Sequence, residues 1–235
     1  MWNGKTKAIT FSYDDGVMQD IRFIELLNKY NLKGTFNINS SLLGLPGRLD
    51  RFGEKITHDK IKAEDLKYVY DGHEVAVHTL THPNLTELSD TVITRQVELD
   101  RQILSELAGY EVIGMAYPCG GVNNDDRVAK IINDTTGVKY ARTITSTHNF
   151  DLQSNLYRFN PTVYHIETDK MLELATEFIE SDYLTPQLLY IWGHTYEFDK
   201  DNGMPWDQIE EFFKLISGKN DIFYGTNKQV LLDCD

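Results

Sequence analysis

Polar residues that could carry out chemistry follow several of the short apolar runs in this chain. Asp14-Asp15-Gly16 follows the first run, the segment His78-Thr79-Leu80-Thr81-His82 follows the third, and His194 follows Gln187–Trp192. Other runs end at Tyr117, Arg142 and His165. If these runs are parallel strands of one barrel, the residues meet at its carboxy-terminal rim, where such barrels build active sites.

His78 and His82 could bind a metal ion together, since two imidazoles four residues apart lie one turn apart if the segment coils. The pair alone is a weak signal, because capping or hydrogen-bonded loop histidines are about as common. Asp15 strengthens the prediction. Two histidines and one carboxylate leave positions open for water, as in a catalytic metal site.

Asp14 and His194 are the candidates for proton transfer. Neighbouring aspartates cannot both point at one ion, so Asp15 can bind the metal while Asp14 reaches a water molecule beside it. His194 can donate a proton, because imidazole titrates near neutral pH. Both residues also have ordinary interpretations: Asp-Asp-Gly is a common turn sequence, and a strand-end histidine can be a buried, hydrogen-bonded residue.

Strands and helices alternate in the predicted secondary structure. The predicted extended segments are Ala8–Tyr13, Gly34–Ile38, His73–Val77, Val112–Tyr117, Val138–Arg142, Tyr157–Tyr164 and Gln187–Trp192. The predicted helices are Val17–Tyr30, Ala63–Tyr70, Thr91–Leu107, Asp125–Asp134, Asp169–Glu180 and Trp206–Ile216. Asn39–His58 contains Gly and Pro without a clear period, and this predicts a long surface loop.

This alternation indicates an α/β protein whose parallel sheet has helices outside it. A closed barrel and an open doubly wound sheet both fit the order of the elements. No Gly-x-Gly-x-x-Gly segment follows the first strand, which disfavours a dinucleotide-binding fold. We expect a single domain over residues 1–235, since the sequence contains no repeat or linker.

The composition is that of a globular protein. Hydrophobic residues make up 41% and charged residues 25% of the 235, which excludes wholesale disorder. No apolar run approaches the roughly 20 residues of a membrane span. The net charge of −13 and the lack of a basic cluster argue against nucleic acid or an anionic membrane as a partner.

Two features bear on the cellular compartment. The only cysteines, Cys119 and Cys234, are far apart in the sequence, so no disulfide framework is expected. The amino terminus lacks the apolar segment and cleavage site of a signal peptide, which predicts a cytoplasmic protein. A secreted chain trimmed of its leader would have the same sequence, so secretion stays open.

Four motifs resemble those of the polysaccharide deacetylase family, also called carbohydrate esterase family 4. The first, Thr-Phe-Asp-Asp-Gly, is similar to Ser12–Gly16, and the second, His-Ser/Thr-x-x-His, is matched fully by His78–His82. The third, Arg-x-Pro-aromatic-Gly, is matched in part by Ala116–Gly120. The fifth, a hydrophobic strand that ends in histidine, resembles Leu188–His194. The motifs occur in the family order.

The resemblance implies a distorted (β/α) barrel of seven or eight parallel strands that removes N- or O-linked acetyl groups from an oligosaccharide or polysaccharide. It implies a divalent metal, most often zinc, with Co²⁺, Ni²⁺ or Mn²⁺ as alternatives. Asp14 would be the general base and His194 the general acid. The implied metal ligands are Asp15, His78 and His82, and the implied oxyanion or substrate contacts are Tyr117, Pro118, Cys119 through its backbone N–H, Trp192 and His165.

The chain departs from the family pattern at three places. Ala116 replaces the arginine of the third motif, and Arg142 at the next strand end is predicted to orient the base instead, with a surface ion pair as the alternative. The fourth motif, Asp-x-x-Asp-Trp, has no clear match, and Asp151 is the candidate that tunes His194. Trp192 stands where the family commonly has leucine against the acetyl methyl group.

Two alternatives to a metal-dependent deacetylase stay open. A hydrolase of small amides or ureides would share the barrel, but the metal-poor enzymes of that kind lack the ligand set of Asp15, His78 and His82. A glycan-binding barrel without turnover fits the missing arginine and the missing fourth motif. The intact Asp14 and His194 favour an enzyme, because a binding module needs neither.

Overall fold

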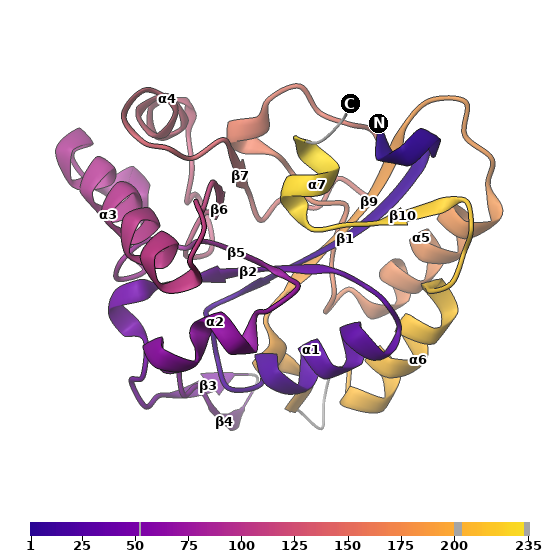
Figure 1. Ribbon diagram of the computed structural model, residues 1–235, viewed down its shortest axis with the longest axis horizontal. Coiled ribbons are helices and arrows are strands. Elements are labelled where there is room, and N and C mark those ends of the chain that lie inside the picture. Colours follow the sequence, from indigo (N-terminus) through magenta and orange to yellow (C-terminus); the bar gives the residue numbers. More distant parts are fainter. Residues whose placement is uncertain (52, 200–203, 233–235) are drawn as a thin grey trace.

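The structure is a computed structural model that describes residues 1–51, 53–199 and 204–232, so Cys234 lies outside the described residues. A parallel sheet forms its centre, with helices around it (Figure 1). The strands of this sheet are β1 (Lys7–Asp14), β2 (Gly34–Ile38), β5 (Glu74–Val77), β6 (Gly114–Ala116), β7 (Tyr140–Arg142), β8 (Val163–Tyr164), β9 (Gln187–Gly193) and β10 (Ile222–Tyr224). The helices are α1 (Asp20–Lys29), α2 (Leu66–Val69), α3 (Asp90–Ala108), α4 (Asp126–Thr135), α5 (Thr168–Glu180), α6 (Trp206–Ile216) and α7 (Asn227–Leu231).

The sheet curls into a distorted barrel, which confirms the predicted fold class. Its strands follow the order β7-β6-β5-β2-β1-β9-β8, and β10 pairs with the first part of β1. An isolated parallel bridge between Phe159 and Arg142 links the segment before β8 to β7, so the two edges of the sheet approach each other. The carboxy-terminal ends of the strands therefore share one rim.

The helices bury apolar stripes against the outer side of the sheet. In α3, for example, Ile93, Val97 and Leu104 are fully buried, as their helical spacing predicts. The first predicted helix begins later than expected, at Asp20, because Val17 pairs with Lys60 in an antiparallel bridge. Among the described helices, none has the length and apolar character needed to cross a membrane.

The prediction of an irregular loop over Asn39–His58 is wrong in its second half. Strands β3 (Arg48–Arg51) and β4 (Glu54–Thr57) pair there as an antiparallel ribbon, here called the rim hairpin. Leu49 lies opposite Ile56, and both pack with Val17 and Tyr196. With so few apolar positions, the hairpin shows no period in the sequence.

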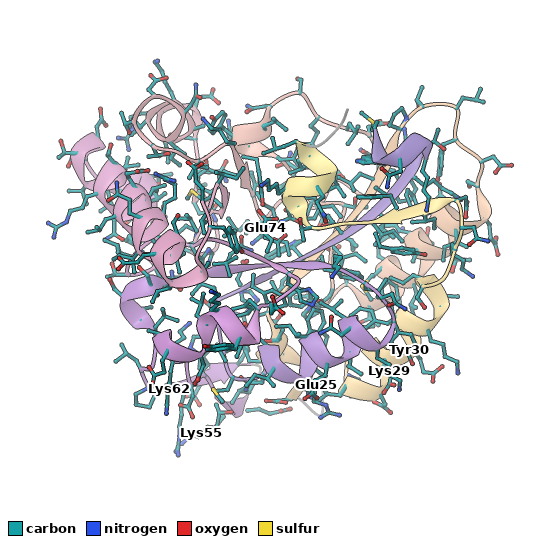
Figure 2. All side chains as sticks on the ribbon, viewed as in Figure 1. Glu25, Lys29, Tyr30, Lys55, Lys62 and Glu74 are labelled. Atoms are coloured by element: carbon teal, nitrogen blue, oxygen red, sulfur yellow. The ribbon has the colours of Figure 1, made fainter. Side chains whose placement is uncertain are left out.

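The inside of the barrel holds a buried polar network around Glu74, the first residue of β5. Its carboxylate accepts hydrogen bonds from the hydroxyls of Thr35 (2.9 Å) and Tyr140 (2.7 Å) and from the backbone N–H of Lys228 (2.9 Å) in α7. Figure 2 shows Glu74 at the centre of the molecule and Lys55 at its periphery. Glu74 thus ties α7 to the amino-terminal end of the barrel.

We expect Glu74→Ala to lower the free energy of unfolding by about 3 kcal/mol, because it leaves two hydroxyls and an N–H buried without an acceptor. Urea denaturation followed by circular dichroism measures the loss. Glu74→Gln, which keeps one acceptor oxygen, should lose about 1 kcal/mol. Equal stabilities of the alanine variant and the wild type would show that the network contributes nothing.

Candidate active site

A cavity of about 650 Å³ opens at the carboxy-terminal rim of the barrel. Most of the residues predicted for the site line it, namely Asp14, Asp15, His78, His82, Tyr117, Cys119, Trp192 and His194. The rim hairpin and the chain on either side of it supply another wall, which includes Leu45, Leu49, Arg51, His58 and Lys60. Residues far apart in the sequence meet in one cavity of the size of a small-molecule site.

Asp14, the last residue of β1, is held by a buried ion pair. Arg142 at the end of β7 places Nη2 2.5 Å from both carboxylate oxygens. The side-chain amide of Asn37 donates a further hydrogen bond to Oδ1, at 2.8 Å. Arg142 is fully buried, so the alternative of a surface ion pair is wrong. The pair fixes the direction of the carboxylate, which a general base requires.

Asp15, His78 and His82 form a group that could hold a metal ion, since one ligand atom of each lies within 4.8 Å of the others. Asp15 Oδ1 is 3.7 Å from His82 Nε2 and 4.0 Å from His78 Nε2. Ligand atoms of a tetrahedral zinc site lie about 3.4 Å apart, so a small inward movement suffices. Two imidazole nitrogens and one carboxylate oxygen suit zinc or a similar divalent ion. The residues fit the predicted group.

The surroundings of His78 fix its tautomer and its charge in the form that a metal ligand needs. Its Nδ1 lies 2.9 Å from the carbonyl oxygen of Ala116, so Nδ1 carries the proton and Nε2 presents its lone pair on the side of Asp15. Burial lowers the pKa of His78 to about 4. The imidazole is therefore neutral near pH 7, and this is the form that binds a metal.

The backbone around these residues is strained. Asp15, Thr79, His82 and Cys119 have φ angles of 86°, 69°, 61° and 69°, in the left-handed region that residues with a Cβ atom disfavour. Surrounding contacts hold these conformations; the Asn39 amide, for example, donates to the carbonyl oxygen of Thr79 at 2.9 Å. Strain of this kind clusters at functional sites.

Two residues that the sequence analysis missed hold Asp15 from the side of the rim hairpin. His58 Nε2 lies 3.0 Å from Asp15 Oδ2, and Lys60 Nζ donates to the Asp15 carbonyl oxygen at 2.7 Å. Burial alone would raise the pKa of Asp15, but the hydrogen bond from His58 and the charge of Lys60 lower it well below its ordinary value. Both residues lie at or just past the end of the segment taken for a loop, which is why sequence pattern did not reveal them.

His194, which follows β9, is paired with a carboxylate that the sequence analysis also missed. Its Nδ1 lies 3.3 Å from Glu197 Oε2 and 3.1 Å from the Tyr164 hydroxyl, which itself donates to Glu197 Oε1 at 2.7 Å. Burial alone would lower the pKa of His194, but the charge and hydrogen bond of Glu197 raise it above its ordinary value. Glu197 stands only three residues after His194, and that spacing was the available signal.

The predicted tuning residue, Asp151, is far from this pair. It forms a bridge with Gln187, the first residue of β9, whereas His194 follows the last. Burial alone would raise the pKa of Glu197, but His194 and His165 beside it lower it well below its ordinary range. The carboxylate next to the candidate acid is therefore Glu197.

The structure corrects the expected substrate contacts of His165 and Pro118. His165 is buried, with Nδ1 3.1 Å from the Tyr13 hydroxyl and Nε2 3.2 Å from Glu197. Neighbouring residues of an extended segment point to opposite sides, so Tyr164 lines the cavity and His165 does not. Pro118 is also buried and does not line the cavity.

The ligand set predicts that the purified protein binds about one divalent ion per chain. His82→Ala should abolish tight zinc binding, since two protein ligands remain. Calorimetric titration of the chelator-treated protein with zinc measures this. His148→Ala, which removes an exposed histidine that pairs with Glu167, is the matched control and should bind zinc like the wild type. Unchanged zinc affinity in His82→Ala would refute the assignment.

Known proteins share this fold and part of this sequence. A family model described as Polysaccharide deacetylase matches residues 3–140. The chain is 28% identical over 120 residues to the peptidoglycan-N-acetylglucosamine deacetylase PgdA of Listeria monocytogenes, and the alignment covers 50% of this chain and 22% of that protein. The whole of PgdA is thus several times longer than the region that this chain matches.

Two solved structures show the same fold. A family 4 acetyl xylan esterase from Clostridium thermocellum, in complex with a cobalt ion, has a TM-score of 0.59 at 12% identity, with 95% of this chain and 90% of that chain covered. BA3943 from Bacillus anthracis, described as a CE4 family pseudoenzyme, has a TM-score of 0.57 at 19% identity, with 96% and 66% covered. The family model matches more than half of the residues, and the chain belongs to the polysaccharide deacetylase family.

Proposed function

We propose that this protein is a metal-dependent deacetylase that hydrolyses N- or O-linked acetyl groups of a carbohydrate. The observation that carries the proposal is the meeting, in one cavity, of a fixed carboxylate, a metal-ligand set and a histidine of raised pKa. Family membership supports acetyl hydrolysis. The printed activity of PgdA on N-acetylglucosamine of peptidoglycan supports an acetylated glycan as substrate.

Different residues of the cavity have different roles in the proposed reaction. A divalent cation held by Asp15, His78 and His82, with zinc as the first choice, would supply a Lewis acid and make hydroxide available near neutral pH. Asp14 accepts a proton from the attacking water. Its Oδ2 lies 4.0 Å from His78 Nε2, so the base borders the ligand set.

The other steps belong to Cys119 and His194. The backbone N–H of Cys119 donates to the oxyanion that forms at the acetyl carbonyl, and one such donor stabilises the transition state by about 3 kcal/mol. His194 donates a proton to the departing nitrogen or oxygen. An amine leaving group needs this proton more than an alkoxide does, and a protonated His194 serves both.

A glycan-binding barrel without turnover is the second candidate, favoured by the fold shared with the pseudoenzyme BA3943. Two departures from the family pattern suggested it, and other residues compensate for both in this structure. Arg142 contacts Asp14 in place of the missing third-motif arginine, and Glu197 contacts His194 in place of the missing fourth motif. This compensation supports catalysis.

Acetate release tests the proposal. We expect the zinc-loaded protein to release acetate from at least one member of a panel of N-acetylated chito-oligosaccharides, peptidoglycan fragments and O-acetylated xylo-oligosaccharides, and a chelator to stop the release. Asp14→Asn should keep zinc and lower kcat by about 100-fold or more, because it removes the base and no ligand. No acetate from any substrate, with zinc bound, would favour the binding barrel. Release of ammonia or an amine from small amides or ureides, with no acetate from any glycan, would favour the other hydrolase.

The pairing of His194 with Glu197 predicts a shift in the pH profile. Loss of the Glu197 charge in Glu197→Gln lowers the pKa of His194, so less of the acid form remains at a given pH. The alkaline limb of kcat/KM should therefore move to lower pH, by about one unit. Asp151→Asn, an exposed change at the other end of β9, is the control and should leave the profile unchanged. An unmoved alkaline limb in Glu197→Gln would refute this role of Glu197.

A further inference from the structure

Trp192 of β9 contacts both Arg142, which pairs with Asp14, and Tyr164, which contacts His194. It is 5% exposed, and the guanidinium carbon of Arg142 lies 4.5 Å from the centroid of its ring. The ring of Tyr164 stacks on it, with centroids 4.1 Å apart and an angle of 19° between the planes. One indole thus touches the arginine next to the base and the tyrosine next to the acid.

On the side of the base, Trp192 completes the support of Arg142. Hydrogen bonds fix the edges of the guanidinium: Nε donates to Ser12 Oγ at 3.2 Å and Nη1 to the Thr143 carbonyl oxygen at 3.0 Å. The aromatic ring contacts its face. A planar guanidinium that is held at its edges and its face cannot rotate, so Nη2 stays on both oxygens of Asp14.

On the side of the acid, Trp192 contacts both Tyr164 and His194; the His194 ring meets the indole edge to face, with centroids 5.9 Å apart. The Tyr164 hydroxyl lies 2.7 and 2.8 Å from the two carboxylate oxygens of Glu197 and 3.1 Å from Nδ1 of His194. Stacking on Trp192 sets the plane of the tyrosine ring and therefore the place of its hydroxyl. The hydroxyl thus lies between the Glu197 carboxylate and His194.

We propose that Trp192 is a positioning residue that orients both proton-transfer groups, Asp14 through Arg142, and His194 through Tyr164 and through its own contact with the histidine ring. Its expected effect on kcat rests on the proposed deacetylase function. Its expected effect on the mobility of Arg142 rests on the contacts alone. The proposal requires no contact between the indole and the substrate. The linked supports make base and acid depend on the same side chain.

The first measurement needs no turnover. In Trp192→Leu, hydrogen exchange of the Arg142 Nε–H, followed by NMR, should become about tenfold faster or more, because the face of the guanidinium is free. Trp192→Phe keeps an aromatic face and should keep most of the protection. Trp206→Leu is the matched control, since Trp206 is also buried and has the guanidinium carbon of Arg22 4.5 Å from its ring. It should leave the Arg142 signal unchanged.

The second measurement is kinetic. Trp192→Leu should lower kcat by about tenfold or more with little change in KM or zinc affinity, and Trp192→Phe should recover most of kcat. Arg142→Lys and Tyr164→Phe should each cost less in the Trp192→Leu background than in the wild type, because their support is already lost. If Trp192→Leu does not fold, as judged by circular dichroism, Trp192→Met replaces it.

The outcomes separate the inference from the proposed function. Absence of acetate release by the wild type contradicts the proposed function, and the exchange measurement still decides the structural claim. An unchanged Arg142 exchange rate in Trp192→Leu overturns the inference. A loss of kcat with Arg142 still protected also overturns it, because Trp192 then acts by contact with the substrate.

Discussion

The buried ion pair between Asp14 and Arg142 is the constraint around which the site is arranged. Removal of two charges from water costs several kcal/mol for each ion, and only close geometry and further hydrogen bonds offset that cost. Here Asn37 donates to Asp14, while Ser12 and Thr143 accept from Arg142. These partners belong to β1, β2 and the end of β7, so the pair stays buried only while those strands keep their order.

The same principle gives otherwise similar side chains different charge environments. Asp14, Asp15 and Glu197 are three buried carboxylates at one rim, and each has a different cationic neighbour. Two of the three histidines that the proposed chemistry uses, His78 and His194, differ likewise. Burial lowers the pKa of His78, which suits a metal ligand, and the Glu197 charge raises that of His194, which suits an acid. Environments that move pKa values apart assign such roles.

Sequence reasoning was most successful where it relied on strand ends. It predicted a parallel sheet, the meeting of Asp14, His78 and His194 at one rim and the neighbourhood of Arg142, because parallel strands place their ends at one rim. The family resemblance, rather than the strand pattern, favoured the barrel over an open sheet. Sequence reasoning failed where contacts come from segments whose sequence has no repeating apolar pattern. The rim hairpin has only Leu49 opposite Ile56 as a sign of its pairing, and His58 reaches Asp15 only through that fold. Strand alternation separates Tyr164, which lines the cavity, from His165, which does not.

This chain has Ala116 at the position of the third-motif arginine and carries an arginine on the next strand instead, at Arg142. The change has a simple geometric basis. Ala116 of β6 and Arg142 of β7 are direct partners in the register of the sheet, so both lie at the same level of the barrel. Neighbouring strands are about 4.8 Å apart, a distance that an arginine side chain spans easily. An arginine on either strand can therefore reach Asp14, provided that the paired residue on the other strand has a small side chain. Its approach from β7 brings its face against Trp192, where the family pattern has leucine, and an aliphatic side chain offers no such face. The small Ala116, the guanidinium of Arg142 and the face of Trp192 thus fit together, and they keep a cation on Asp14.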